Sequence, residues 1–219
     1  MAKKVLRWIG IVVLLLLFAS GKVAYVGLPI TATVVDAQTG KPIEGAIVVA
    51  IWQLYGGMEG GNWEGQAKVL ETVSDANGRF HFSWWGPRIH TPLGELTTRA
   101  PDLLLFARGY DPKRVRNADS RIGVLQASDW NGKTIPMSSR TADSKAYAAQ
   151  LEHFDPMELF YDSCGWQHAP RLLVALDEEA QMLRAQGPGL DPGTSLRGRD
   201  EARLSACGSV ETYVRGHVR

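Results

Sequence analysis

The chain has 219 residues, of which 45% are hydrophobic and 21% charged, and its formal net charge is +1 at pH 7. This length suits one good-sized domain with an added segment or two small domains, and the composition excludes a disordered chain. The near-neutral charge gives no general attraction to nucleic acid, and the basic run of Lys113, Arg114 and Arg116 lacks interleaved aromatic residues. We therefore expect no nucleic-acid partner.

The N-terminal segment, residues 1–27, has the pattern of an export signal. Three basic residues precede an uncharged run at positions 8–21, and a basic region before a short apolar region directs export. Cleavage after Gly21 would leave a secreted or periplasmic protein. Without cleavage, residues 5–28 would form a single-pass anchor in a bacterial inner membrane, with the body of the protein in the periplasm. We favour the anchor because the first expected strand begins only a few residues later.

Short apolar stretches separated by turn residues fill positions 29–137 and predict a mainly β domain. Residues 47–52 are apolar on both faces, as in a central strand, whereas the glycine-rich residues 55–65 are expected to form a loop. The segment 86–101, which has three prolines, is expected to be a second, long loop. The expected strands cover residues 30–36, 47–52, 67–74 and 103–108, with weaker candidates at 113–116, 122–125 and 133–136.

The stretch SDANGRFHFSWW at 74–85 is predicted to turn at its Asn-Gly pair and to form a hairpin with the strand at 67–74. Alternation along this stretch places its two phenylalanines and Trp84 on one face, in the core. Trp85 has the opposite parity and is expected to be exposed at the end of the strand.

Trp85 is one of three aromatic residues that we predict to bind a ligand. Together with Tyr55 and Trp63 from the glycine-rich segment, it would form a platform on which a sugar or a peptide stacks. The alternative is that the three rings only cover the edges of the sandwich.

After about residue 140 the apolar period changes from that of strands to that of helices. The only two cysteines, Cys164 and Cys207, both lie in this region, 141–219, and an even pair in an exported protein predicts a disulfide. The region is expected to be a small helical appendage. Its expected helices cover residues 143–154 and 171–186, with a shorter candidate at 199–206.

Three blocks, taken together, resemble the carboxypeptidase regulatory-like domain, a member of the transthyretin-like (prealbumin-like) group of β-sandwiches. They are VVDAQTGKPIEGA at 34–46, SDANGRFHF at 74–82 and ARGY at 107–110. The resemblance covers about residues 29–116 and implies a transthyretin-like antiparallel β-sandwich at 28–140. The expected organisation is therefore an N-terminal membrane or signal helix, this sandwich and the helical C-terminal appendage.

The sequence offers little support for catalysis or metal binding. The Asp-x-Asn-Gly start of 74–85 resembles half of a calcium loop, but no carboxylate follows it until Glu95. The motifs of serine hydrolases, zinc proteases and phosphate-binding loops are missing. Some transthyretin-like proteins hydrolyse 5-hydroxyisourate and end in Tyr-Arg-Gly-Ser, which residues 213–217 (YVRGH) lack. We therefore expect no catalytic site, no metal and no cofactor.

These observations predict a non-catalytic, exported protein of the bacterial envelope that is tethered to the inner membrane and contacts an envelope protein partner. The alternative is a module that binds carbohydrate or cell-wall glycan through Tyr55, Trp63 and Trp85. A third possibility is a hydrolase whose site lies in the segment 86–101, around His90 and Glu95.

Overall fold

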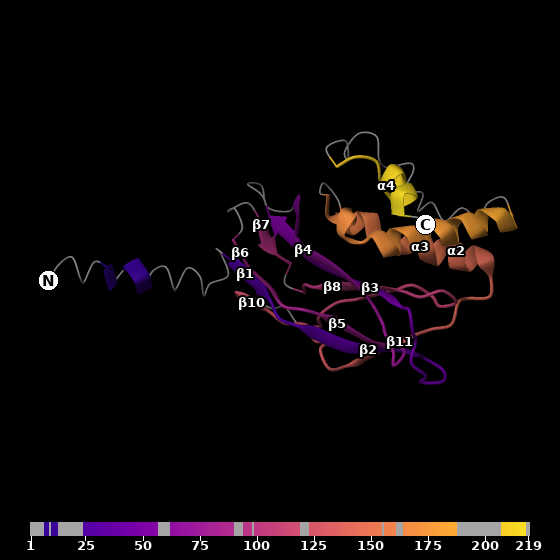
Figure 1. Cartoon of the computed structure of the whole chain (residues 1–219), viewed down its shortest axis with the longest axis horizontal. Helices are drawn as coiled ribbons and strands as arrows, with labels where there is room; N and C mark the ends of the chain where they lie inside the picture. The colour runs from indigo at the N-terminus through magenta and orange to yellow at the C-terminus, as the bar shows by residue number, and fades with distance from the viewer. Residues whose placement is uncertain are drawn as a thin grey trace.

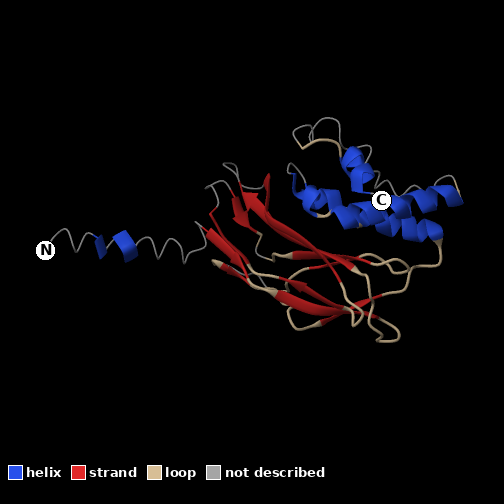
Figure 2. Cartoon of the chain, in the orientation of Figure 1, coloured by secondary structure: helices blue, strands red, loops and turns tan. Residues whose placement is uncertain are grey.

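The protein consists of stacked layers of strands covered on one side by helices (Figures 1 and 2). The chain is represented by a computed structural model, and it is mainly β with a few small helices. The structure describes residues 7, 8, 10–12, 24–56, 62–89, 94–97, 99–118, 123–154, 156–160, 164–187 and 207–217.

The outer layer of strands is made of two small sheets that continue one another. Their strand orders are β10-β1-β6 and β11-β2-β5, and the members of each sequential pair, such as β1 and β2, hold corresponding positions. In each pair, the chain leaves the first strand and enters the second after a short break; between β1 and β2 the break is Leu28 and Pro29. The bounds are β1 Ala24–Gly27, β2 Ile30–Asp36, β5 Arg79–Phe82, β6 Trp85–Ile89, β10 Leu125–Gln126 and β11 Thr134–Met137.

The central layer is an antiparallel sheet of order β4-β3-β8-β9, with β7 also pairing with β3. Strand β3 is rich in β-branched residues and is buried along most of its length, which fits its position inside the sheet. The bounds are β3 Ile47–Gly56, β4 Asn62–Val73, β7 Gly94–Leu96, β8 Asp102–Phe106 and β9 Lys113–Val115.

Side chains of the central sheet alternate between two separate cores, because successive residues of a strand point to opposite faces. On β8, Leu105 packs in the core between the two strand layers and Leu104 packs in the core beneath the helices, and both are fully buried. The sandwich core also holds Trp52, Phe80 and Phe82. The protein is therefore a β-sandwich with a helical layer on the outer face of its central sheet. The sandwich is not wholly antiparallel as expected, because β10 pairs with β1, and β11 with β2, in parallel.

The helical layer packs on that face and shares its core. Helix α3 begins at Pro170, which suits a first helical turn, and Glu71 of β4 caps it, since its carboxylate accepts from the amides of Arg171 (3.1 Å) and Leu172 (2.9 Å). The sheet thus holds the start of the helix directly. The bounds are α2 Ser144–His153, η1 Pro156–Phe160, η2 Cys164–His168, α3 Pro170–Gln186 and α4 Val210–His217.

Several expectations about the strands were wrong. The strand after the Asn-Gly turn, β5, pairs with β2 in the outer layer rather than with β4. The turn is present, because the Asp75 side chain accepts from the amides of Asn77 and Arg79 (both 2.9 Å), but it carries the chain from one layer to the other. A turn motif fixes the local reversal of the chain and does not fix which strands pair.

The two expected loops contain regular structure. Strands β3 and β4 run into the glycine-rich segment as far as Gly56 and Asn62, because their register holds through local irregularities. The segment 86–101 supplies most of β6 and all of β7. Strand β10 overlaps the weak candidate at 122–125 only at Leu125, and helix α4 was not predicted. The helix candidate at 199–206 lies outside the described residues.

The N-terminal anchor cannot extend to residue 28 as expected. Residues Ala24–Gly27 form β1, which pairs with β6 and β10, and Ala24 and Tyr25 are buried in the body of the protein. In the part of the N-terminal segment that the structure describes, residues 7, 8 and 10–12 are helical. No helix among the described residues is both long enough and apolar enough to span a membrane.

Candidate functional site

The first two sequence motifs are joined at one end of the sandwich by a short network of hydrogen bonds. The Ser74 hydroxyl donates to the Ile43 carbonyl (2.7 Å) and accepts from the Ala46 amide (2.9 Å). The carbonyl of Gly78 accepts from the Val34 amide (2.7 Å). A Cβ at Gly78 would collide with the Val34 carbonyl oxygen, so the close approach requires glycine.

The start of the first motif is an ordered turn around Asp36. Its carboxylate accepts from the Thr39 amide (2.7 Å) and hydroxyl (2.9 Å) and from the Gln38 amide (2.9 Å). These bonds, from Thr39 above all, lower the pKa of Asp36. Burial and the neighbouring charge of Asp36 raise the pKa of Tyr110, which belongs to the third motif. The three motifs therefore meet in space.

The motif end of the sandwich forms one wall of a cleft of about 440 Å³. The loop that carries Pro42 and Glu44 lies on one side, and Ala175 of α3 lies on the other. Ile47 and Phe106 contribute apolar surface. We call this hollow the motif cleft; its lining residues are Pro42, Ile43, Glu44, Gly45, Ile47, Phe106, Ala107, Arg108, Tyr110 and Ala175.

Charged groups stand at the rim of the motif cleft. Arg108 forms an ion pair with Glu178 of α3, and their side chains are 65% and 39% exposed. Glu44 is also exposed. The cleft combines apolar surface with a polar rim, as is common in binding sites. Sequence analysis singled out the motifs for their turns and did not predict that they border a cleft with a helix.

The predicted aromatic platform is not assembled as expected. Tyr55 is 45% exposed and lies directly opposite Trp63 in the register of β3 and β4; the side chain of Trp63 is outside the described residues. Trp85, by contrast, is only 7% exposed and packs edge-on against Trp52, with 5.2 Å between ring centroids.

The expected exposure of the two adjacent tryptophans is therefore inverted. Strand β5 ends at Phe82, and a new strand begins at Trp85, so the alternation restarts between them. Trp84, expected in the core, is 63% exposed. Gly27 accommodates the Trp85 indole, since a Cβ at that position would collide with the ring.

The residues of the third possibility are only partly described. His90 lies outside the described residues. Glu95 is on β7, opposite Tyr55 of β3, and is exposed. Among the described residues, no group of three His, Cys, Asp or Glu side chains is arranged to hold a metal ion.

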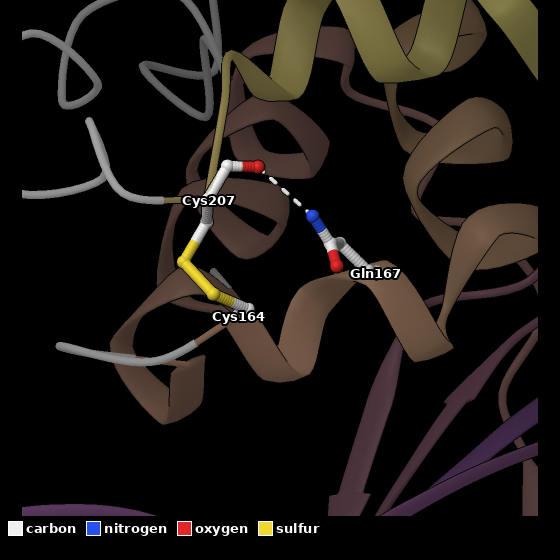
Figure 3. The surroundings of a disulfide bond; sticks show 3 residues. All are labelled: Cys164, Gln167 and Cys207. Carbon is white, nitrogen blue, oxygen red and sulfur yellow. Dashed lines mark hydrogen bonds between the residues drawn. A yellow bond between two sulfur atoms is a disulfide. The ribbon is translucent and has the colours of Figure 1, made fainter.

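The predicted disulfide between Cys164 and Cys207 is confirmed. Its Cα atoms are 5.4 Å apart, and it joins η2 to the residues before α4 (Figure 3). The Gln167 side-chain amide donates to the Cys207 carbonyl (2.9 Å; Figure 3). The Tyr213 hydroxyl donates to the Gln167 carbonyl (2.6 Å). A disulfide of this kind is typical of a protein that folds in an oxidising compartment outside the cytoplasm.

A buried charge pair, which sequence analysis missed, ties the end of the sandwich to α3. Arg140 donates to Glu179 (2.7 Å), whose side chain is 3% exposed. The Arg140 guanidinium also lies 4.0 Å from the centroid of the Tyr147 ring. Burial, followed by the charge of Glu179, raises the pKa of Tyr147. Because Glu179 and Tyr147 are buried, we assign this cluster a structural role.

Comparison with known proteins gives no family for this chain. No family model and no curated protein matches it. A catechol 1,2-dioxygenase from Pseudomonas arvilla C-1 is 14% identical, with a TM-score of 0.32, over 55% of this chain and 54% of that one.

An intradiol ring-cleavage dioxygenase from Tetranychus urticae is 21% identical, with a TM-score of 0.28, over 45% of this chain and 54% of that one. A streptococcal ancillary pilin is 15% identical, with a TM-score of 0.26, over 54% of this chain and 30% of that one. The chain thus spans about half or less of the length of these proteins, and the likenesses are too weak to indicate function.

Proposed function

We propose that this protein is a non-catalytic, exported interaction module of the bacterial envelope and that its motif cleft binds a segment of a partner protein. The observation that carries the proposal is the cleft of about 440 Å³ between the motif end of the sandwich and α3. Its apolar surface would receive one apolar side chain of the partner, and Glu44 and Arg108 at its rim would set the charge of the neighbouring residues.

The proposal includes the family. The three sequence blocks suggest a carboxypeptidase regulatory-like domain over about residues 29–116. Their contact at one end of the sandwich supports this, because blocks that belong to one domain are expected to pack together. Hydrogen bonds of Ser74 and of Gly78 join the first two blocks. Such a domain would supply a rigid frame on which the cleft is carried.

The proposal also includes the location. The disulfide and the export signal favour the periplasmic side of the inner membrane. Trp8, Ile11 and Val12, which are helical, are 69%, 46% and 51% exposed, as suits a helix that contacts lipid. Because β1 occupies Ala24–Gly27, we now assign the tether to residues 5–23. Mass spectrometry of the membrane fraction that finds an intact Met1 would support the tether, and a soluble product beginning at Lys22 would refute it.

Photo-crosslinking tests the motif cleft. A crosslinking residue in place of Glu44, which is exposed at the rim, should yield one saturable adduct in intact cells. The same residue at Lys145, which is exposed on α2, is the matched control. The added substitution Arg108→Glu reverses the rim charge and should reduce the adduct at position 44 severalfold. If positions 44 and 145 give the same adducts, or if Arg108→Glu has no effect, the cleft does not bind the partner.

A second candidate function rests on Tyr55, whose ring is 45% exposed opposite Trp63 in the β3–β4 pair. Aromatic rings at the end of such a pair are suited to stack on sugars, so we propose glycan binding as the alternative. Retention on envelope polysaccharide should fall in Tyr55→Ala and remain unchanged in Trp84→Ala, which removes a more exposed aromatic side chain elsewhere. Equal retention in both variants would exclude Tyr55 as a glycan-binding residue.

A further inference from the structure

A second hollow, of about 250 Å³, lies next to the disulfide and shares no lining residue with the motif cleft. It is formed by three segments that are far apart in the sequence: strand β4, strand β6 and the short helix η2. We call it the basic pocket. Its lining residues are Gln66, Ala67, Lys68, Val69, Arg88, Cys164, Gly165, Gln167 and His168.

Each of the three segments contributes one basic side chain to this pocket. Lys68 lies on β4, the edge strand of the central sheet, and is half-buried. Arg88 lies on β6, paired with Tyr25 of β1, and is exposed. His168 ends η2 and is exposed. The pocket is therefore lined by two permanently charged cations and an imidazole, which donates from at least one ring nitrogen.

These basic groups differ from the two cations beside the buried Asp102. Arg114 and Arg116 both donate to Asp102 (3.0 and 2.6 Å). Within the part of the chain that the structure describes, Lys68, Arg88 and His168 form no ion pair and no side-chain hydrogen bond, and no carboxylate lines their pocket. Like charges gathered without a counter-charge repel one another, and a bound anion relieves that repulsion.

The walls of the basic pocket are held in place before any ligand arrives. The disulfide and the bond from Gln167 to the Cys207 carbonyl fix η2. The Gln66 side-chain amide donates to the Leu159 carbonyl (2.6 Å), which fixes β4 against the helical layer. The backbone around the pocket is thus held in place, and the three basic side chains supply its charge. Only these side chains have to be ordered by a ligand, which lowers the entropic cost of binding.

We propose that the basic pocket is a binding site for a phosphate group. A phosphate monoester carries up to two negative charges and presents three free oxygens, which matches two cations and an imidazole better than one carboxylate does. The guanidinium of Arg88 would bind two of these oxygens at once, and Lys68 would supply a point charge. The remaining volume accommodates part of the molecule that bears the phosphate. This site is separate from the motif cleft and does not depend on the function proposed for it.

Calorimetric titration of the full-length protein in detergent with inorganic phosphate tests the site. We expect saturable binding, weakened at least about tenfold by Lys68→Gln and again by Arg88→Gln, because each variant removes a charged hydrogen bond. Lys145→Gln and Arg79→Gln, which remove exposed basic residues outside the pocket, are the matched controls. The absence of saturable binding, or equal losses in pocket and control variants, would overturn the proposal.

A second set of titrations identifies the source of the phosphate. Vesicles of phosphatidylcholine with phosphatidic acid, whose headgroup is a phosphate monoester, are compared with vesicles of phosphatidylcholine alone, so that the tether contributes equally to both. If the double variant Lys68→Gln/Arg88→Gln loses the added affinity for phosphatidic acid and the control variants keep it, the ligand is a lipid headgroup. If the pocket variants affect only inorganic phosphate, the ligand is a soluble phosphate compound.

Discussion

The two faces of the central sheet are held to their covering layers in different ways. On the sandwich face, apolar side chains interdigitate, and backbone bonds of nearby turns close the end, as with Ser74 and Gly78. On the helical face, the apolar core is supplemented by a few polar links, since Glu71 of β4 caps α3 and Arg140 pairs with Glu179. The Cys164–Cys207 disulfide then ties η2 to the residues before α4 within the helical layer. A sheet face covered by strands is thus fixed by local turns, whereas the face covered by helices is fixed by a few specific connections at its edges.

Removing the disulfide should destabilise the helical layer more than any other change considered, and should leave the sandwich layer less affected. Replacement of Cys164 and Cys207 by Ser frees a loop with a sequence separation of 43, which should lower the free energy of unfolding by about 4 kcal/mol. Amide hydrogen exchange should accelerate first in α4 and η2, and last in β2 and β5. Equal acceleration in both layers would show that the helical layer does not depend specifically on its covalent link.

The neighbouring leucines of β8 test whether the two faces unfold together. Leu104→Ala removes a fully buried side chain from the helical core, and Leu105→Ala does the same in the sandwich core. Each should cost about 3 kcal/mol. Because both cores rest on the same sheet, we expect one unfolding transition that shifts similarly in both variants. A separate early transition in Leu104→Ala alone would mean that the helices detach from an intact sandwich.

A smaller effect is expected at high pH from Tyr147, which lies only on the helical side. Its pKa is raised from the ordinary value of 10.0 by burial and by the charge of Glu179. The folded state therefore keeps a proton that the unfolded state loses, so stability is full below pH 10 and falls as the pH rises above it. The slope should approach about 1.4 kcal/mol per pH unit. Tyr147→Phe should lack this part of the slope; an unchanged slope would exclude Tyr147 as its source.

The smallest effect should come from Arg108, whose ion pair with Glu178 joins the two regions at the rim of the motif cleft. Both side chains are substantially exposed, so Arg108→Gln should change the free energy of unfolding by less than about 1 kcal/mol. Chemical denaturation measures this directly. A larger loss would mean that the pair supports the junction of sandwich and helices rather than only the surface of the cleft.

The sequence predicted those parts of the fold that short-range chemistry determines. The strand at Ile30–Asp36, the buried strands β3 and β8, and helix α3 follow from apolar period and turn residues. The disulfide followed from the count of cysteines together with the export signal. The pairing of β5 with β2 was missed, because a turn motif does not encode which distant strand the chain joins after the turn.

The site was less predictable, because it depends on contacts between segments that are remote in sequence. Trp84 and Trp85 exchange their expected environments because of one break in a strand, which nothing in their immediate sequence marks. The basic pocket collects Lys68, Arg88 and His168 from three elements, and no spacing along the chain links them. Only the packing of η2 on the edge of the sheet brings them together.

The bond between Cys164 and Cys207 also affects what happens to the chain in any oxidising compartment that contains proteases. A cut at any peptide bond between the two cysteines would leave the pieces covalently joined, so helix α4 would stay with the body of the protein. Such a nicked chain would run at full mass on a non-reducing gel and separate only after reduction. The cross-link therefore stabilises the fold and also keeps helix α4 attached to the protein when a peptide bond between the two cysteines is cleaved.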